Sequence, residues 1–84
     1  MNLTNYVAQS PRQERGKVRE RLGIRIAALA GMPEPIPEGT MRSYTNGARE
    51  MPPTLGLALE SATGGAVTRV DQWPHIPWIV QHKI

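Results

Sequence analysis

A helix-turn-helix pattern spans Ile26-Ala-Ala-Leu-Ala-Gly-Met32 and, after a proline-rich interruption, Thr40-Met-Arg-Ser-Tyr-Thr-Asn-Gly47. The motif needs a small residue where its two helices cross closely, and a glycine at the turn, where the backbone takes positive φ. Ala27 and Gly31 occupy these two positions. Met41 and Tyr44, three residues apart, can face the first helix together. The two segments therefore predict a helical corner.

The second helix of this motif leaves short polar and basic side chains for its outer face. Such side chains read base edges and nearby phosphates when a helix lies in the major groove of DNA. They are Thr40, Arg42, Ser43, Thr45 and Asn46. Met41 comes four residues later than an uninterrupted motif would place it, so Pro33–Gly39 must form a widened turn. The alternative is an ordinary two-helix corner of a small bundle.

Apolar periodicity and helix-breaking residues predict an all-α domain of about five short helices with an extended C-terminal tail. The expected helices cover residues 3–9, 11–22, 24–30, 37 or 38 to 46, and 52–63. We expect Gly23 to end the second helix, and the third to be mostly buried through Ile24, Ala27 and Ala28, with Leu29 alongside. The last helix should stop at Gly64-Gly65, before a short strand or extended segment at 66–70. The helix-turn-helix domain is thus expected at 1–70 and an apolar tail at 71–84.

Positive charge is concentrated in one part of the chain. The formal net charge is +3, but residues 12–25 carry six basic side chains against Glu14 and Glu20, a local excess of 6 − 2 = +4. This distribution favours a polyanionic partner held by phosphate contacts. The expected phosphate contacts are Arg12, Arg15, Lys17, Arg25 and Arg49. The alternative is a solvated helix face with internal ion pairs.

Composition argues against several functional classes. The chain has no cysteine, and its two histidines, His75 and His82, lie in a proline-broken segment without a nearby cluster of carboxylates. We therefore expect no catalytic site, no metal site and no cofactor. No apolar run approaches the roughly 20 residues of a membrane span, and no signal peptide is expected. The prediction is a cytoplasmic protein without a membrane partner.

The C-terminal segment is more apolar than a solvated tail. Its large apolar residues are Trp73, Ile76, Trp78, Ile79 and Val80. Three interpretations remain open: these side chains fold back over the thin core of their own chain, pack against a second copy to form a two-fold dimer, or dock on a different protein.

The segment that precedes this tail resembles a known family. Segment 53–69 is similar to the end of the YdaS-like and Cro-type phage regulators, which finish a last helix with a Glu-x-Ala-Thr-Gly-Gly-x-Val-Thr-Arg pattern. The matching residues are Glu60, Ala62, Thr63, Gly64, Gly65, Val67, Thr68 and Arg69. The resemblance implies a small helical DNA-binding regulator, often dimeric and often carried by phage or prophage.

The middle of the chain departs from the family pattern. In that family Leu22-Gly23-Ile24 would end the first motif helix, which puts Arg19 where a small residue belongs and makes the apolar segment 25–30 the reading helix. The register on Gly31 avoids both problems but requires the widened turn.

These observations predict a sequence-specific DNA-binding transcriptional regulator, Cro- or repressor-like, that reads the major groove of double-stranded DNA with a helix at about 38–46 and acts as a homodimer in a bacterial host. The alternative is a small phage-type interaction protein, an antirepressor or inhibitor, that binds a host or phage protein rather than DNA. The loop at 33–39 and the tryptophan-rich tail would then be its working surface.

Overall fold

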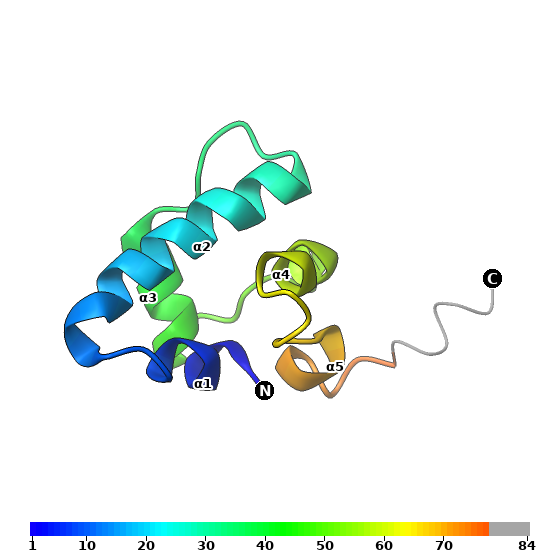
Figure 1. Ribbon diagram of the computed structural model, residues 1–84. Coiled ribbons are helices and arrows are strands. Elements are labelled where there is room, and N and C mark those ends of the chain that lie inside the picture. The colour runs from blue at the N-terminus through cyan, green and yellow to red at the C-terminus, as the bar shows by residue number, and fades with distance from the viewer. Residues whose placement is uncertain (78–84) are drawn as a thin grey trace.

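Five α-helices form the part of the chain that the computed structural model describes, residues 1–77 (Figure 1). The long helix α2 packs against α3 and α4, while α1 contacts both α2 and α3, and α5 follows α4. No strand is present within these residues, so the predicted all-α class is confirmed. The helices are α1 (Leu3–Ala8), α2 (Arg15–Ala30), α3 (Glu38–Asn46), α4 (Gly56–Ala62) and α5 (Arg69–Gln72), with short 3₁₀ helices at Arg12–Glu14 and Pro53–Leu55.

Helix α2 is continuous through Gly23, so the predicted break at this residue is wrong. Gly23 is buried, and a Cβ atom built on it would collide with the carbonyl oxygen of Ile36 and press on Met41. The backbone amide of Ile36 also donates a hydrogen bond to the Gly23 carbonyl at 3.3 Å. The missing side chain therefore serves a close approach between α2 and the following loop, rather than a helix end.

The end of α2 is at Gly31, as the sequence predicts. Gly31 takes a φ of 74°, and the backbone amide of Met32 donates to the carbonyl of Ala27 at 2.9 Å. This is the hydrogen-bond pattern of a helix terminated by a left-handed glycine. The connection over residues 31–37 then leads to α3, which makes it the widened turn that the sequence requires.

The core lies where α2, α3 and α4 meet, and the burial expected for residues 24–30 is confirmed at Ala27 but wrong at Ile24, Ala28 and Leu29. Leu22, Ile26 and Ala27 are buried, whereas Ile24, Ala28 and Leu29 are exposed. The spacing explains this result, because a continuous helix keeps Val18, Leu22 and Ile26 on one stripe. Within residues 1–77, the buried apolar residues are Leu3, Val7, Leu22, Ile26, Ala27, Ile36, Met41, Met51, Ala58, Leu59, Val67 and Trp73.

The segment after α4 contains a helix where the sequence predicted a strand or extended chain. Gly64 and Gly65 end α4 with φ angles of 61° and 86°, as expected. Thr68 then caps α5, because its hydroxyl accepts from the Asp71 amide at 3.1 Å while the Asp71 carboxylate accepts from the Thr68 amide at 3.3 Å. This reciprocal capping box outweighs the β-branched character of the segment.

Trp73 completes the core from the C-terminal side. Its side chain is fully buried, and the indole Nε1–H donates to the backbone carbonyl of Met51 at 2.8 Å. The expected domain boundary at residue 70 falls inside α5, and the Leu3 amide donates to the Gln72 side chain at 2.8 Å. Residues 71–73 therefore belong to the folded domain and not to a separate tail.

Candidate nucleic-acid interface

Helix α3 is fixed to the rest of the molecule through its inner face. Met41 is fully buried, and Tyr44 is half-buried against the core, so both point inward as the sequence predicts. Glu38 begins the helix directly after Pro37, and Gly47 ends it with a φ of 82°. The helix is therefore a short rod, anchored at Met41 and free on the opposite face.

The outer face of α3 carries a narrow stripe at Gly39, Arg42 and Asn46, all exposed. Their spacing of three and four residues places them on one side of the helix. The Arg42 side chain is 62% exposed, and the Asn46 side-chain oxygen accepts from the Ala48 amide at 2.9 Å. A glycine, a guanidinium and an amide thus form a surface with little bulk at its N-terminal end.

Thr45 is not on this surface, so its predicted role in base contacts is wrong. It is 8% exposed, and its hydroxyl donates to the Arg42 carbonyl at 2.9 Å. The Thr4 hydroxyl of α1 donates to the Thr45 carbonyl at 2.6 Å. Since Thr45 follows Met41 by four residues, it shares the inner face and holds α1 against α3.

Two further predicted reading residues are half-buried. The Ser43 hydroxyl donates to the Gly39 carbonyl at 3.2 Å, within its own helix. Thr40 lies on the side of α3 that borders an apolar hollow, described below. Of the five predicted reading residues, Arg42 and Asn46 are exposed, Ser43 and Thr40 lie beside them with partial exposure, and Thr45 is buried.

A carboxylate that the sequence did not single out organises the arginines at the start of α3. Glu38 accepts from Arg19 Nη2 of α2 at 3.0 Å and from Arg42 Nη2 at 3.2 Å. The hydrogen bonds from Arg19, helped by the charge of Arg42, hold the pKa of the Glu38 carboxyl below its usual value. The spacing of four residues between Glu38 and Arg42 is the one signal in the sequence for this contact.

The predicted phosphate-binding residues do not form one cluster. Arg15 donates to the carbonyls of Ser10 at 3.0 Å and Ala8 at 3.1 Å, so its guanidinium satisfies the end of α1. Arg25 borders a hollow with Tyr6 and Ala62, whereas α3 packs on α2 near Arg19 and Gly23. The remaining predicted residues, Arg12, Lys17 and Arg49, are exposed.

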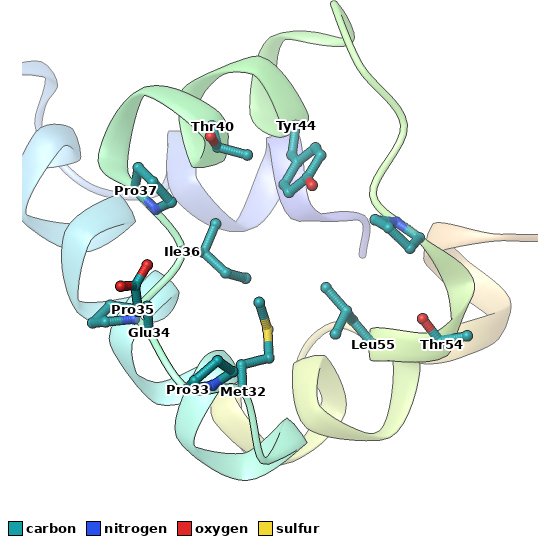
Figure 2. Close-up of a pocket in the computed structure, with 11 residues that line it drawn as sticks. Met32, Pro33, Glu34, Pro35, Ile36, Pro37, Thr40, Tyr44, Thr54 and Leu55 are labelled. Carbon is teal, nitrogen blue, oxygen red and sulfur yellow. The ribbon is translucent and has the colours of Figure 1, made fainter.

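An apolar groove lies beside α3, with a volume of about 540 Å³. The loop 32–37 forms one wall, Thr40 and Tyr44 of α3 a second, and Pro52, Thr54 and Leu55 a third (Figure 2). Met32, Ile36 and Leu55 point into the space between these walls. The proline-rich loop therefore shapes a surface of its own, next to the face that carries Arg42.

The predicted dimer interface is wrong at one of its residues. Trp73 is buried in its own chain, which is the fold-back alternative, and it offers no surface to a second copy. Ile76 is half-buried and packs against the same core. Trp78, Ile79 and Val80 lie outside the described residues.

Among residues 1–77, no group of three or more metal-ligating side chains comes together. The nearest arrangement is a single contact of 3.6 Å between His75 Nε2 and Glu50 Oε1. None of the helices described is both long enough and apolar enough to cross a membrane. Comparison with protein-family models, with curated proteins and with solved structures found no match.

Proposed function

We propose that the protein is a sequence-specific DNA-binding transcriptional regulator that reads the major groove with α3. One observation carries the proposal: α3 is anchored on its inner face at Met41 and exposes Gly39, Arg42 and Asn46 in a stripe on its outer face. Arginine and asparagine are the side chains that read guanine and adenine through paired hydrogen bonds. The small Gly39 permits close approach of the helix to DNA.

The burial pattern narrows the set of contacts in this proposal. Arg42 and Asn46 contact base edges, and Ser43 and Thr40 contact bases or the adjoining backbone. Arg49 follows the end of α3, and with Arg12 and Lys17 it supplies phosphate contacts, which fix the position of the protein without reading sequence. Two copies occupy a two-fold-symmetric site in the cytoplasm of a bacterial host.

The proposed function is tested by selection from random DNA. Purified protein is incubated with a pool of random duplexes at about 150 mM salt, where non-specific phosphate contacts are weakened, and the retained molecules are sequenced. We expect one enriched site with two-fold symmetry. The Arg42→Ala variant should lose this enrichment, whereas Arg21→Ala, an equal loss of an exposed charge on α2, should keep it.

Two results would contradict the proposal. Salt-sensitive retention without enrichment would describe a basic protein that does not read sequence. No retention would favour a second candidate function, an antirepressor or inhibitor that binds a host or phage protein. The observation that favours this second candidate is the apolar groove beside α3, one wall of which is the loop 32–37.

A further inference from the structure

A second, smaller hollow of about 240 Å³ is lined by residues of α1, α2 and α4 (Figure 1). Four of its lining residues are apolar or aromatic, namely Tyr6, Val18, Leu22 and Ala62. The other two are Arg21 and Arg25, and no carboxylate of the described residues is among them. Sites that hold a whole small-molecule ligand measure about 300–1,000 Å³, so this hollow has the size for a single side chain.

The two arginines at the hollow are exposed, and residues 1–77 give them no partner. Arg21 and Arg25 make neither an ion pair nor a hydrogen bond with the described chain, whereas Arg19 of the same helix is held by an ion pair of 3.0 Å to α3. Glu14 and Glu20 border Arg21 in neighbouring hollows, without an ion pair to it. Two uncompensated positive charges therefore lie beside an apolar hollow.

The spacing of these charges matches a short acidic peptide. Arg21 and Arg25 are four residues apart on α2, which separates them by about 6 Å along the helix axis. Two residues of extended chain span about 7 Å. Carboxylates on either side of one apolar residue can therefore lie opposite both guanidiniums, each of which can donate two parallel hydrogen bonds to a carboxylate. The apolar residue between them then faces the hollow.

This hollow and the exposed face of α3 are separate surfaces. Helix α3 and the loop before it pack on α2 at Arg19, which binds Glu38, and at Gly23, which contacts Ile36. Arg21 and Arg25 each follow one of these α2 residues by two positions, a rotation of about 200° around the helix. A partner bound at the hollow therefore leaves the outer face of α3 uncovered.

We propose that the hollow binds an acidic segment of another protein, in which carboxylates flank one large aliphatic side chain. The aliphatic group leaves water in the hollow, while the two arginines hold its neighbours. Nucleic acid, the other common polyanion, fits less well. Single strands are bound by stacking on open aromatic rings, whereas Tyr6 is half-buried against the core. The inference does not depend on the proposed function, because α3 takes no part in it.

A capped peptide of sequence Asp-Glu-Leu-Asp-Glu is the probe. It is titrated into the isotopically labelled full chain, and the amide NMR signals are followed. We expect saturable shifts at Tyr6, Val18 and Ala62, with Thr40 and Arg42 of α3 unchanged. A peptide with serine in place of leucine keeps every charge and should bind about tenfold more weakly, because the apolar contact is lost. Equal binding of the two peptides would contradict the use of the hollow.

A matched pair of double variants tests the two arginines. Arg21→Gln with Arg25→Gln removes both charges at the hollow, whereas Arg12→Gln with Arg49→Gln removes two exposed charges elsewhere. We expect the first variant to bind the peptide about tenfold more weakly, and the second to stay within about twofold of the unmodified chain. Equal losses would mean that net charge alone attracts the peptide, and would overturn the proposal.

Three further results would also overturn it. The first is the absence of saturable shifts with the peptide at millimolar concentration. The second is displacement of the peptide by a random single-stranded or duplex oligonucleotide, which would make the hollow a phosphate site. The third is the same set of shifts on raising the protein concentration without peptide, which would assign the hollow to a second copy. The peptide titrations contain no nucleic acid, so their outcome is independent of the DNA-binding test.

Discussion

The carbonyl oxygen of Ile36 lies in the space that a side chain on Gly23 would fill, while the Ile36 amide donates to the Gly23 carbonyl at 3.3 Å. These two contacts join the middle of α2 to the last turn of the connection that leads into α3. They set where α3 begins relative to α2, and they do so through backbone atoms alone. The position of the proposed reading helix therefore depends on a residue far from its exposed face.

The Gly23→Ala variant should be less stable, although alanine is the better helix former. Replacing glycine by alanine inside a helix normally gains about 1 kcal/mol. At Gly23 the added Cβ meets backbone that cannot move aside, and overpacking of this kind costs about 1–3 kcal/mol or more. Urea denaturation measures the net change in the free energy of unfolding.

Gly16 provides the matched control in the same helix. A Cβ at this position lies 3.6 Å from Glu38 Oε1, an ordinary contact with a flexible side chain. We expect Gly16→Ala to be neutral or to stabilise by up to about 1 kcal/mol. A Gly23→Ala variant as stable as Gly16→Ala would show that the Gly23–Ile36 contact does not constrain the fold.

The Trp73→Phe variant tests the contact that closes the core. Phenylalanine keeps most of the ring but removes the indole donor, so the Met51 carbonyl loses its 2.8 Å hydrogen bond. The expected loss is about 1–3 kcal/mol in the free energy of unfolding. Trp73→Ala removes the ring as well and should lose about 3–5 kcal/mol. Equal losses in the two variants would mean that ring volume contributes nothing.

The ion pairs of Glu38 predict a pH dependence of stability. Because the Glu38 pKa is lowered from its ordinary value of 4.5, the folded state gains stability from this group above that pH and loses it as the pH falls through the lower, folded-state pKa. Glu38→Gln should therefore have a lower melting temperature than the unmodified chain at pH 7. The difference should narrow on acidification below pH 4.5.

Glu20, an exposed carboxylate within the basic segment 12–25, is the control for this experiment. The Glu20→Gln variant should have the same melting temperature as the unmodified chain, both at pH 7 and below pH 4.5. A Glu38→Gln difference that persists unchanged in acid would mean that the effect comes from packing of the side chain and not from its charge.

Arg42→Ala tests the reading role on the selected DNA site. If the guanidinium contacts a base, specific affinity falls by about 1–3 kcal/mol and discrimination at one base pair is relaxed. Arg49→Ala removes a proposed phosphate contact and should weaken binding to all sequences alike, with a shallower dependence on salt. Titrations against the selected site and its single-base variants measure both. An equal loss of affinity for all sequences in Arg42→Ala would show that Arg42 does not contact a base.

Local signals in the sequence predict the helix ends well. Gly31, Gly47 and the Gly64-Gly65 pair end helices with positive φ, and Met41 faces inward as its spacing indicates. Each of these features depends on neighbours a few residues away. The all-α class and the start of α3 at Glu38 follow from the same kind of information.

The errors arise where distant segments meet. No residue near Gly23 in the sequence indicates that the Ile36 backbone packs against it, so the local pattern predicts a helix end there. The polar side chain of Thr45 predicts a place on the outer face, but Thr45 is buried and the Thr4 hydroxyl of α1 donates to its carbonyl. Arg15 has the charge of a phosphate contact, yet its guanidinium donates to the Ala8 carbonyl at the end of α1. These partners are visible only in three dimensions.

The burial of Trp73 has a consequence for how the protein is made. The Leu3 amide binds the Gln72 side chain, and Leu3, Val7 and Trp73 are packed in one core. At a synthesis rate of about 5–20 residues per second, the first helix waits roughly 4–14 seconds before residue 73 is added. The apolar face of α1 leaves the ribosome without its final partners. The core is therefore completed only after Trp73 has been synthesised, and chaperones have access to the N-terminal helices until then.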